Sequence, residues 1–274
     1  MRIIALVLPV VAAHFSLTPF APAWAGKASL IWPFAADSRP RLGFVGGLPR
    51  QSGSRVTPLL AGLAGLGLLA AALGLFGLFY RFVLLPWHLR WGATEVEARA
   101  TMPGDELVAA PNMSSTRAIT IRASAAQIWP WLVQLGQGRG GMYSYEWLEN
   151  LAGCDIHNAD RILPEFQNLK VGDLIHMGPE GYPFYSVEHI QPNHALVLRP
   201  HDPKTKEPGT AAWSFLLAEQ GDGTTRLISR QQMVYQPSVA NFIGWKVITE
   251  PLSFIMEQKM LRTLKARAES VATR

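Results

Sequence analysis

The stretch FYSVEHIQPNHALVLR at residues 184–199 decides the fold class, because apolar and polar residues alternate on both sides of the turn residues Pro192 and Asn193. Alternation with a period of two is typical of β-strands with one buried face, so we expect strands at 184–190 and 195–199. The pattern continues outward in VGDLIHM at 171–177, AAWSFLLA at 211–218 and TTRLISRQQMVY at 224–235. Strands that follow one another across short turns predict an antiparallel sheet.

Helical patterns precede and follow these strands. Residues 116–123 (TRAITIRA) alternate and predict a first strand, and Ser124 is a suitable N-cap for a helix over 125–135. A second helix is expected over 144–151. The chain ends in a predicted helix over 238–268, bent at Pro251. The apolar stripe of this helix consists of Leu252, Ile255, Met256, Met260 and Leu264.

This order of elements predicts an α+β fold with one long C-terminal helix. An antiparallel sheet with an apolar face must bury that face, and the terminal helix is its natural cover. A curved sheet around one helix leaves space between the two, and such clefts are usual sites for small molecules.

A long uncharged segment lies in the N-terminal third. Residues 56–80 read VTPLLAGLAGLGLLAAALGLFGLFY, and Arg55 and Arg81 flank them. About 20 apolar residues are enough to cross the hydrocarbon core of a bilayer. We therefore predict a single transmembrane helix over 56–80.

The remaining boundaries follow from this helix. Residues 1–25 are a signal-like segment with Ala23-Trp24-Ala25 as a cleavage pattern, or alternatively a first apolar membrane segment. Residues 26–55 are a basic linker, residues 81–115 a juxtamembrane and extended lead-in, and residues 116–270 the globular domain.

The positive charge is confined to the N-terminal segment. Residues 1–55 hold six basic residues and one acidic residue, whereas the rest of the chain holds 19 of each, so the net charge of +5 belongs to the first 55 residues. A domain without basic excess does not suit nucleic acid. Short loops rich in Lys and Arg stay in the cytoplasm, and five such residues precede the helix after residue 25 against three over 81–99. This asymmetry favours an extracytoplasmic domain, whereas a cleaved signal peptide predicts the opposite side.

Three stretches resemble one protein superfamily. They are HLRWGATEVEARATMPGDELV at 88–108, TRAITIRASAAQIWPWLVQLGQGRGGMYSYEWLENLAG at 116–153 and RILPEFQNLKVGDLI at 161–175. They resemble a membrane-anchored bacterial group of the SRPBCC superfamily, whose helix-grip fold includes START lipid-transfer domains, polyketide cyclase-like proteins and pollen-allergen-like carriers. The resemblance implies an internal apolar cavity but transfers no ligand, because this fold serves carriers, cyclases and regulators alike.

The candidate ligand-binding residues share a polar group or an adaptable apolar body. Arg139 can pair with a ligand carboxylate, or internally with Glu146 or Glu149. Amphipathic aromatic side chains suit a cavity mouth, inward polar residues on strands suit a ligand anchor, and methionines beneath the terminal helix suit varied apolar shapes. The full set is Arg139, Tyr143, Tyr145, Trp147, His176, Arg199, Trp213, Arg230, Met256 and Met260.

Known catalytic and cofactor motifs are not matched in their required context. Residues 136–141 match G-x-G-x-x-G, but they follow a helix, which indicates a turn with positive φ rather than a dinucleotide site. Cys154, the only cysteine, excludes an internal disulfide, and no metal-binding spacing occurs, so we expect no cofactor and no metal. The titratable residues of segment 155–173, such as His157, are expected to be mostly solvated.

Three functions remain open. The leading hypothesis is a membrane-anchored binding protein for an apolar or amphipathic, lipid-like small molecule. The second is an enzyme of the cyclase or dehydratase type that uses the same cavity. The third is a structural or regulatory membrane protein whose own side chains fill the cavity.

Overall fold

The computed structural model describes residues 56–272, with side chains described from Leu60 to Val271. The predicted segments 1–25 and 26–55 lie outside the described residues. The chain divides into two units, one that ends at Phe82 and one that begins, among the described residues, at Val83. Each is described by itself.

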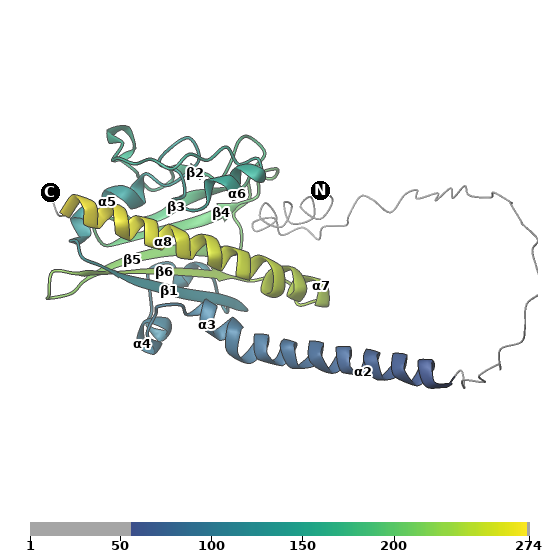
Figure 1. Ribbon diagram of the computed structural model, residues 1–274. Helices are drawn as coiled ribbons and strands as arrows, with labels where there is room; N and C mark the ends of the chain where they lie inside the picture. The colour runs from purple at the N-terminus through teal and green to yellow at the C-terminus, as the bar shows by residue number, and fades with distance from the viewer. Residues whose placement is uncertain (1–55, 273–274) are drawn as a thin grey trace, which may run out of the picture. The chain divides into compact units, whose positions relative to one another are not determined.

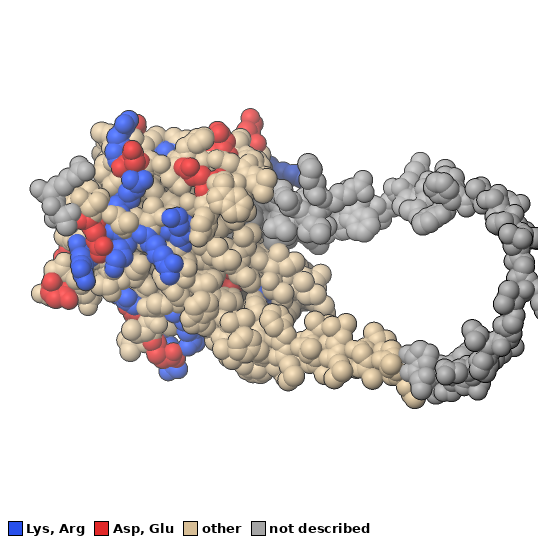
Figure 2. Space-filling model, in the orientation of Figure 1, with Lys and Arg blue, Asp and Glu red and all other residues tan. Residues whose placement is uncertain are grey.

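The first unit contains helix α2 (Val56–Phe79), which has no acidic residue in its first turn and no basic residue in its last turn. Its leucines and phenylalanines are exposed, and its side chains are uniformly uncharged in Figure 2. The most apolar 18-residue stretch within Leu60–Leu89 has a mean hydropathy of 2.1, so within the described chain this helix is long and apolar enough to cross a membrane by length and composition.

The second unit contains an open, curved, six-stranded antiparallel sheet in the order β1-β6-β5-β4-β3-β2. The strands are β1 (Met113–Ile121), β2 (Leu174–His176), β3 (Phe184–Gln191), β4 (Ala195–His201), β5 (Ala211–Glu219) and β6 (Thr225–Met233). The predicted antiparallel sheet is confirmed. The five later strands pair in chain order, and β1 pairs with β6 through the register Arg117 to Ser229.

The long helix α8 (Glu250–Ala272) crosses one face of this sheet (Figure 1). It follows α7 (Val239–Phe242) and a π-helical segment (Ile243–Thr249). The change to α-helical hydrogen bonding occurs next to Pro251, whose missing N–H and ring disfavour a helix interior. The stripe differs from the predicted one, because Ile255 is exposed while Phe254, Glu257 and Leu261 are buried.

The main core lies between α8, α5 (Ala125–Val133) and the sheet. Helix α5 begins where predicted, since the Ser124 backbone N–H donates to Gln127 Oε1 at 3.0 Å in a capping box. Its buried residues Ile128 and Leu132 contact the core formed by α8 and the strands. Burial on one side of each element explains why the period-two and helical patterns are both visible in the sequence.

Residues 95–107 of the segment before β1 cover the opposite face of the sheet, whereas residues 85–89 lie on the α8 side, where His88 contacts Glu250 and Phe254. This segment is not the extended lead-in that the sequence predicted, because it forms α3 (Leu85–Leu89), α4 (Glu95–Arg99) and a 3-10 turn (Asp105–Leu107) after a π-helical segment (Tyr80–Leu84). Gly104 has a φ of +96°, and a Cβ there would lie 2.4 Å from Ser214 Oγ. The close approach of this segment to the sheet therefore requires glycine.

Candidate functional site

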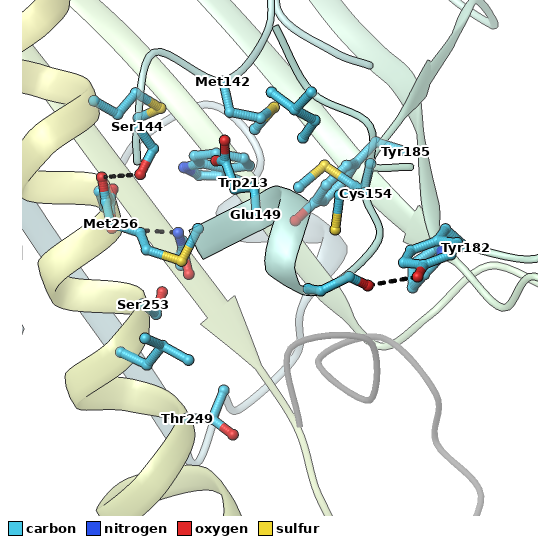
Figure 3. A pocket seen from close by; sticks show the side chains of 18 residues that line it. Met142, Ser144, Glu149, Cys154, Tyr182, Tyr185, Trp213, Thr249, Ser253 and Met256 are labelled. Atoms are coloured by element: carbon cyan, nitrogen blue, oxygen red, sulfur yellow. Dashed lines mark hydrogen bonds between the residues drawn. The ribbon is translucent and has the colours of Figure 1, made fainter. Parts of the chain in front are cut away.

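A cavity lies between α8, the sheet and α6 (Glu146–Leu151) (Figure 3). Helix α6 and the loop after it are held by side-chain hydrogen bonds. The Asn150 side chain accepts from Ile156 N at 2.7 Å and donates to Ile156 O at 2.8 Å. Asn158 Nδ2 donates to Ser144 O at 3.1 Å. These contacts position one wall of the cavity, and α8 forms the other.

The G-x-G-x-x-G turn packs against the loop after α6 and so supports this wall. Gly136 pairs with Gly141 in an isolated bridge, and their φ values are +125° and +77°. A Cβ on Gly141 would lie 2.6 Å from Asn158 Oδ1. The predicted interpretation as a turn that needs positive φ is therefore confirmed.

The lining is mainly apolar. The space that water-sized molecules can reach in the cavity is about 120 Å³. Trp213, on β5, is oriented by a hydrogen bond from its Nε1 to Ser229 Oγ at 2.9 Å. Four methionines and three aromatic side chains contribute to the lining: Met142, Met177, Met256, Met260, Tyr182, Tyr185 and Trp213. Such a surface adapts to apolar molecules of varied shape.

Glu149 points from α6 into this cavity (Figure 3). It is 4% exposed, and within the described chain its Oε2 has no hydrogen-bond partner. Burial, and secondarily the Glu146 carboxylate, raise the pKa of Glu149 to about 7. Burial and the negative charge of Glu149 in turn raise the pKa of the Cys154 thiol, also in the lining, to about 11. The cavity thus holds one titratable carboxyl with an oxygen that has no hydrogen-bond partner in the described chain.

The α8 wall contains a second carboxyl, Glu257, in a buried ionic network. Arg117 on β1 is 1% exposed and makes salt bridges with Glu250 and Glu257 through Nη2 and Nη1. Its Nε donates to the carbonyl oxygen of His88 at 2.9 Å. His88 Nδ1 also contacts Glu250. Because these charges are out of water, each depends on its partners for solvation.

This network adjoins the cavity through Glu257, which also accepts from Ser229 Oγ and from Gln231 Nε2 at 3.3 Å. Burial and the nearby Glu257 charge hold the pKa of Tyr185 well above 10, so its hydroxyl stays protonated. None of the 18 described lining residues is Lys, Arg or His. The cavity is therefore apolar with an acidic character.

Three of the ten predicted site residues meet in this cavity: Trp213, Met256 and Met260. Tyr143 is fully buried behind it, where its hydroxyl accepts from Gln134 Nε2 at 2.6 Å, and burial raises its pKa to about 12. Tyr145 is half-buried with Lys259 over its ring. Trp147 and His176 are exposed. A role of any of these residues in binding stays a prediction.

Arg230 does not face the cavity, although it was considered as an inward anchor. It lies on the opposite face of the sheet, where it contacts Asp105 at 2.7 Å and donates to the carbonyl oxygens of Ala100, Glu97 and Ala98. The period of two in β6 explains this, since its neighbour Ser229 faces α8. Arg230 thereby stabilises the segment before β1.

The other two predicted arginines also bind backbone. Arg199 Nε donates to Gly209 O at 3.1 Å. Arg139 donates to the carbonyl oxygens of Leu135 and Val133 at 3.0 and 2.8 Å, at the C-terminal end of α5. Carbonyl oxygens at a helix end accept no hydrogen bond within the helix, so the guanidinium donates to them. Arg139 therefore binds backbone oxygens rather than Glu146 or Glu149, its expected internal partners.

Sequence reasoning missed Arg117 and Glu149. A signal for Arg117 was present, because Glu250 and Glu257 are seven residues apart and therefore share one face of α8. Two acids on a buried helix face require a cation opposite them. Glu149 had no such signal, since acidic residues on short helices are nearly always exposed.

Among residues 56–272 no group of three or more His, Cys, Asp or Glu side chains is arranged to hold a metal ion. His157 and Asp155, in the loop that was expected to be solvated, are exposed with 3.3 Å between Nε2 and Oδ1.

No protein-family model matches the chain, and no curated protein matches it. Solved structures with some likeness include MLL2253 from Mesorhizobium loti, at 17% identity over 56% of this chain and 98% of that chain, with a TM-score of 0.32. CalU16 from Micromonospora echinospora is 14% identical over 58% of this chain and 86% of that chain, with a TM-score of 0.28. An HSP90 activator from Plasmodium falciparum is 13% identical over 57% and 95%, with a TM-score of 0.37. This likeness concerns the fold alone, and no argument about function rests on it.

Proposed function

We propose that this chain is a membrane-anchored binding protein for a small apolar or amphipathic molecule, held in the internal apolar cavity that the resemblance to the SRPBCC superfamily implies. The observation that carries the proposal is the cavity beneath α8, with four methionines, three aromatic side chains and one buried carboxyl oxygen that has no partner in the described chain. A cavity filled by its own side chains, as in the structural alternative, has no room for about 120 Å³ of water-sized centres.

The size of the cavity restricts the ligand. A cavity of this size suits a small molecule, or one part of a larger lipid-like molecule. The lack of basic side chains in the lining disfavours a fatty-acid carboxylate inside the cavity.

Binding is tested by native mass spectrometry of the full-length wild-type chain and of the variant Met256→Gln, each released from detergent. We expect a co-purified apolar ligand on the wild-type chain and at least tenfold weaker retention in the variant, because an amide replaces an apolar contact. Ile255→Gln on the exposed face of the same helix is the matched control. Equal retention in both variants, or ligand-free wild-type protein, contradicts the proposal.

The anchor rests on α2 and its continuation to Leu89, which suffice by length and composition to cross a bilayer. Alkaline carbonate extraction should leave the chain in the membrane pellet, and release into the supernatant contradicts an anchor. The charge asymmetry favours an extracytoplasmic domain. A membrane-impermeant thiol reagent should therefore label a cysteine introduced at the exposed Glu180 in intact cells, and labelling only after lysis reverses the orientation.

The second candidate is an acid–base enzyme of the cyclase or dehydratase type, and Glu149 is the observation that favours it. A carboxyl with a pKa of about 7 is suited to both proton donation and proton acceptance at neutral pH. If the co-purified molecule changes in mass or structure on incubation with wild-type protein and not with Glu149→Gln, the enzymatic function replaces the carrier function.

A further inference from the structure

We propose that the cavity selects apolar molecules that carry a basic amine, and that the Glu149 carboxylate receives the ammonium group. This inference rests on the proposed function and names the ligand class of the same cavity. It follows from three features of the lining: an unpartnered acceptor, an excess of acidic groups, and a small volume.

The unpartnered acceptor is Glu149 Oε2, in a side chain that is 4% exposed. Buried polar atoms in folded proteins nearly always have a partner, so one without a partner that faces a cavity indicates a group supplied from outside. A carboxylate accepts hydrogen bonds and donates none, and an ammonium group donates three. The positive charge of the ammonium group also compensates the buried negative charge of the Glu149 carboxylate.

Acidic side chains outnumber basic ones over the whole lining. Its two carboxyls are Glu149 and Glu257, and Glu257 already has Arg117, Ser229 and Gln231 as partners. Since none of the described lining residues is basic, an anionic ligand meets no compensating charge. A neutral apolar molecule fits the walls but leaves Glu149 Oε2 without a partner.

The protonation of Glu149 makes this selectivity depend on pH. The titratable groups that face the cavity with it are Cys154 after α6, Tyr182 before β3, Tyr185 on β3 and Glu257 on α8, and Glu146 lies on its own helix. Lys259 lies outside the lining, over the ring of Tyr145. An ammonium next to Glu149 favours the ionised carboxylate, so amine affinity should increase from pH 6 to pH 8.

Cys154 is a built-in reporter for the test, because it is the only cysteine of the chain and lines the same cavity. The full-length chain in lipid nanodiscs is treated with methyl methanethiosulfonate, and the rate of Cys154 modification is followed by intact mass. Three probes of similar size are compared: 2-phenylethylamine, 2-phenylethanol and 3-phenylpropanoate. Ligand-induced shifts in the thermal unfolding midpoint provide a second measurement with the same probes.

At pH 7.5 we expect the amine to protect Cys154 at a concentration at least tenfold lower than the alcohol, and the carboxylate to protect least. In Glu149→Gln the amine and the alcohol should protect equally, with each variant normalised to its own ligand-free rate because Glu149 also affects the thiol. Glu180→Gln, at an exposed position, is the matched control. In the wild-type chain the advantage of the amine should increase from pH 6 to pH 8, which tests the proposal without any variant.

Two failures are distinguishable. Equal protection by amine and alcohol in the wild-type chain, or strongest protection by the carboxylate, overturns the amine selectivity and leaves the binding function standing. Neither protection nor a thermal shift with any of the three probes contradicts the proposed binding function itself.

Discussion

The two walls of the cavity each present a glutamate that is 4% exposed, yet the surroundings of the two carboxyls differ. On the α8 wall, Glu257 contacts Arg117, Ser229 and Gln231. On the α6 wall, Glu149 has an oxygen without a partner in the described chain. The first arrangement contributes to the stability of the fold, whereas the second costs stability and leaves a group available for binding.

The largest expected effect comes from removing α3, which supports the α8 wall. A fragment that begins at Gly92 lacks Leu85 and His88, both buried, and the contact of His88 with Glu250. We expect it to be less stable than a fragment that begins at Val83 by about 5 kcal/mol, from lost apolar burial and a weakened ionic network. Chemical denaturation of both fragments measures this, and coincident unfolding curves would show that residues 83–91 contribute nothing to the stability of the domain.

The next largest effect concerns Arg117. Arg117→Met leaves Glu250 and Glu257 buried without their cation, and we expect a loss of about 3–5 kcal/mol in the free energy of unfolding. Arg199→Met is the matched control on another strand, because Arg199 is partly exposed and makes one backbone hydrogen bond, so its loss should cost about 1 kcal/mol. Similar losses in both variants would show that the buried network adds nothing specific to stability.

Glu149 is expected to make stability depend on pH with a definite sign. Its pKa is raised in the folded state to about 7 from 4.5, so folding favours the protonated form. The stabilising contribution is fully present below about pH 4.5 and is lost as the pH rises through about 7, with a total change of about 3 kcal/mol.

Glu149→Gln should remove this pH dependence, and Glu180→Gln at an exposed position should retain it. Unfolding free energies of the three proteins between pH 4.5 and pH 8.5 measure the difference. A pH profile of Glu149→Gln that coincides with that of the wild type would mean that Glu149 is not buried as a neutral acid.

The smallest effect concerns a hydrogen bond that joins the two walls. Ser144 Oγ donates to the Met256 carbonyl oxygen at 3.0 Å (Figure 3). Ser144→Ala should cost about 1 kcal/mol in thermal or chemical unfolding. Thr263→Ala removes a solvent-exposed hydrogen bond to Lys259 O within α8 and should cost less. If Ser144→Ala is neutral, the walls are held together by apolar packing.

Most of the fold could be predicted from the sequence. Strands β3 to β6 were expected within two residues of their observed ends, because alternation records which side of each strand is buried. The segment before β1 was missed, since α4 and its neighbouring helices have five residues or fewer and no periodic pattern. Their conformation depends on tertiary contacts such as those of Arg230.

The site was predicted less well for a physical reason. Met256, Met260 and Trp213 could be found because adaptable or aromatic side chains on core elements tend to line cavities. The inward arginine was sought at positions 199 and 230, whereas it is Arg117, because the direction of a strand side chain depends on a register that one sequence does not specify. Glu149 is buried against the general tendency of its residue type.

The ionic network beneath α8 has an evolutionary consequence. Arg117 on β1 is far along the chain from Glu250 and Glu257 on α8, yet the three side chains need one another for charge compensation. A single charge-changing substitution at any of these three positions leaves an uncompensated buried charge, whereas replacing the whole set with apolar residues of similar volume can be neutral. We therefore expect the three positions to covary in related sequences, so that ionic and fully apolar combinations occur but mixed ones are rare.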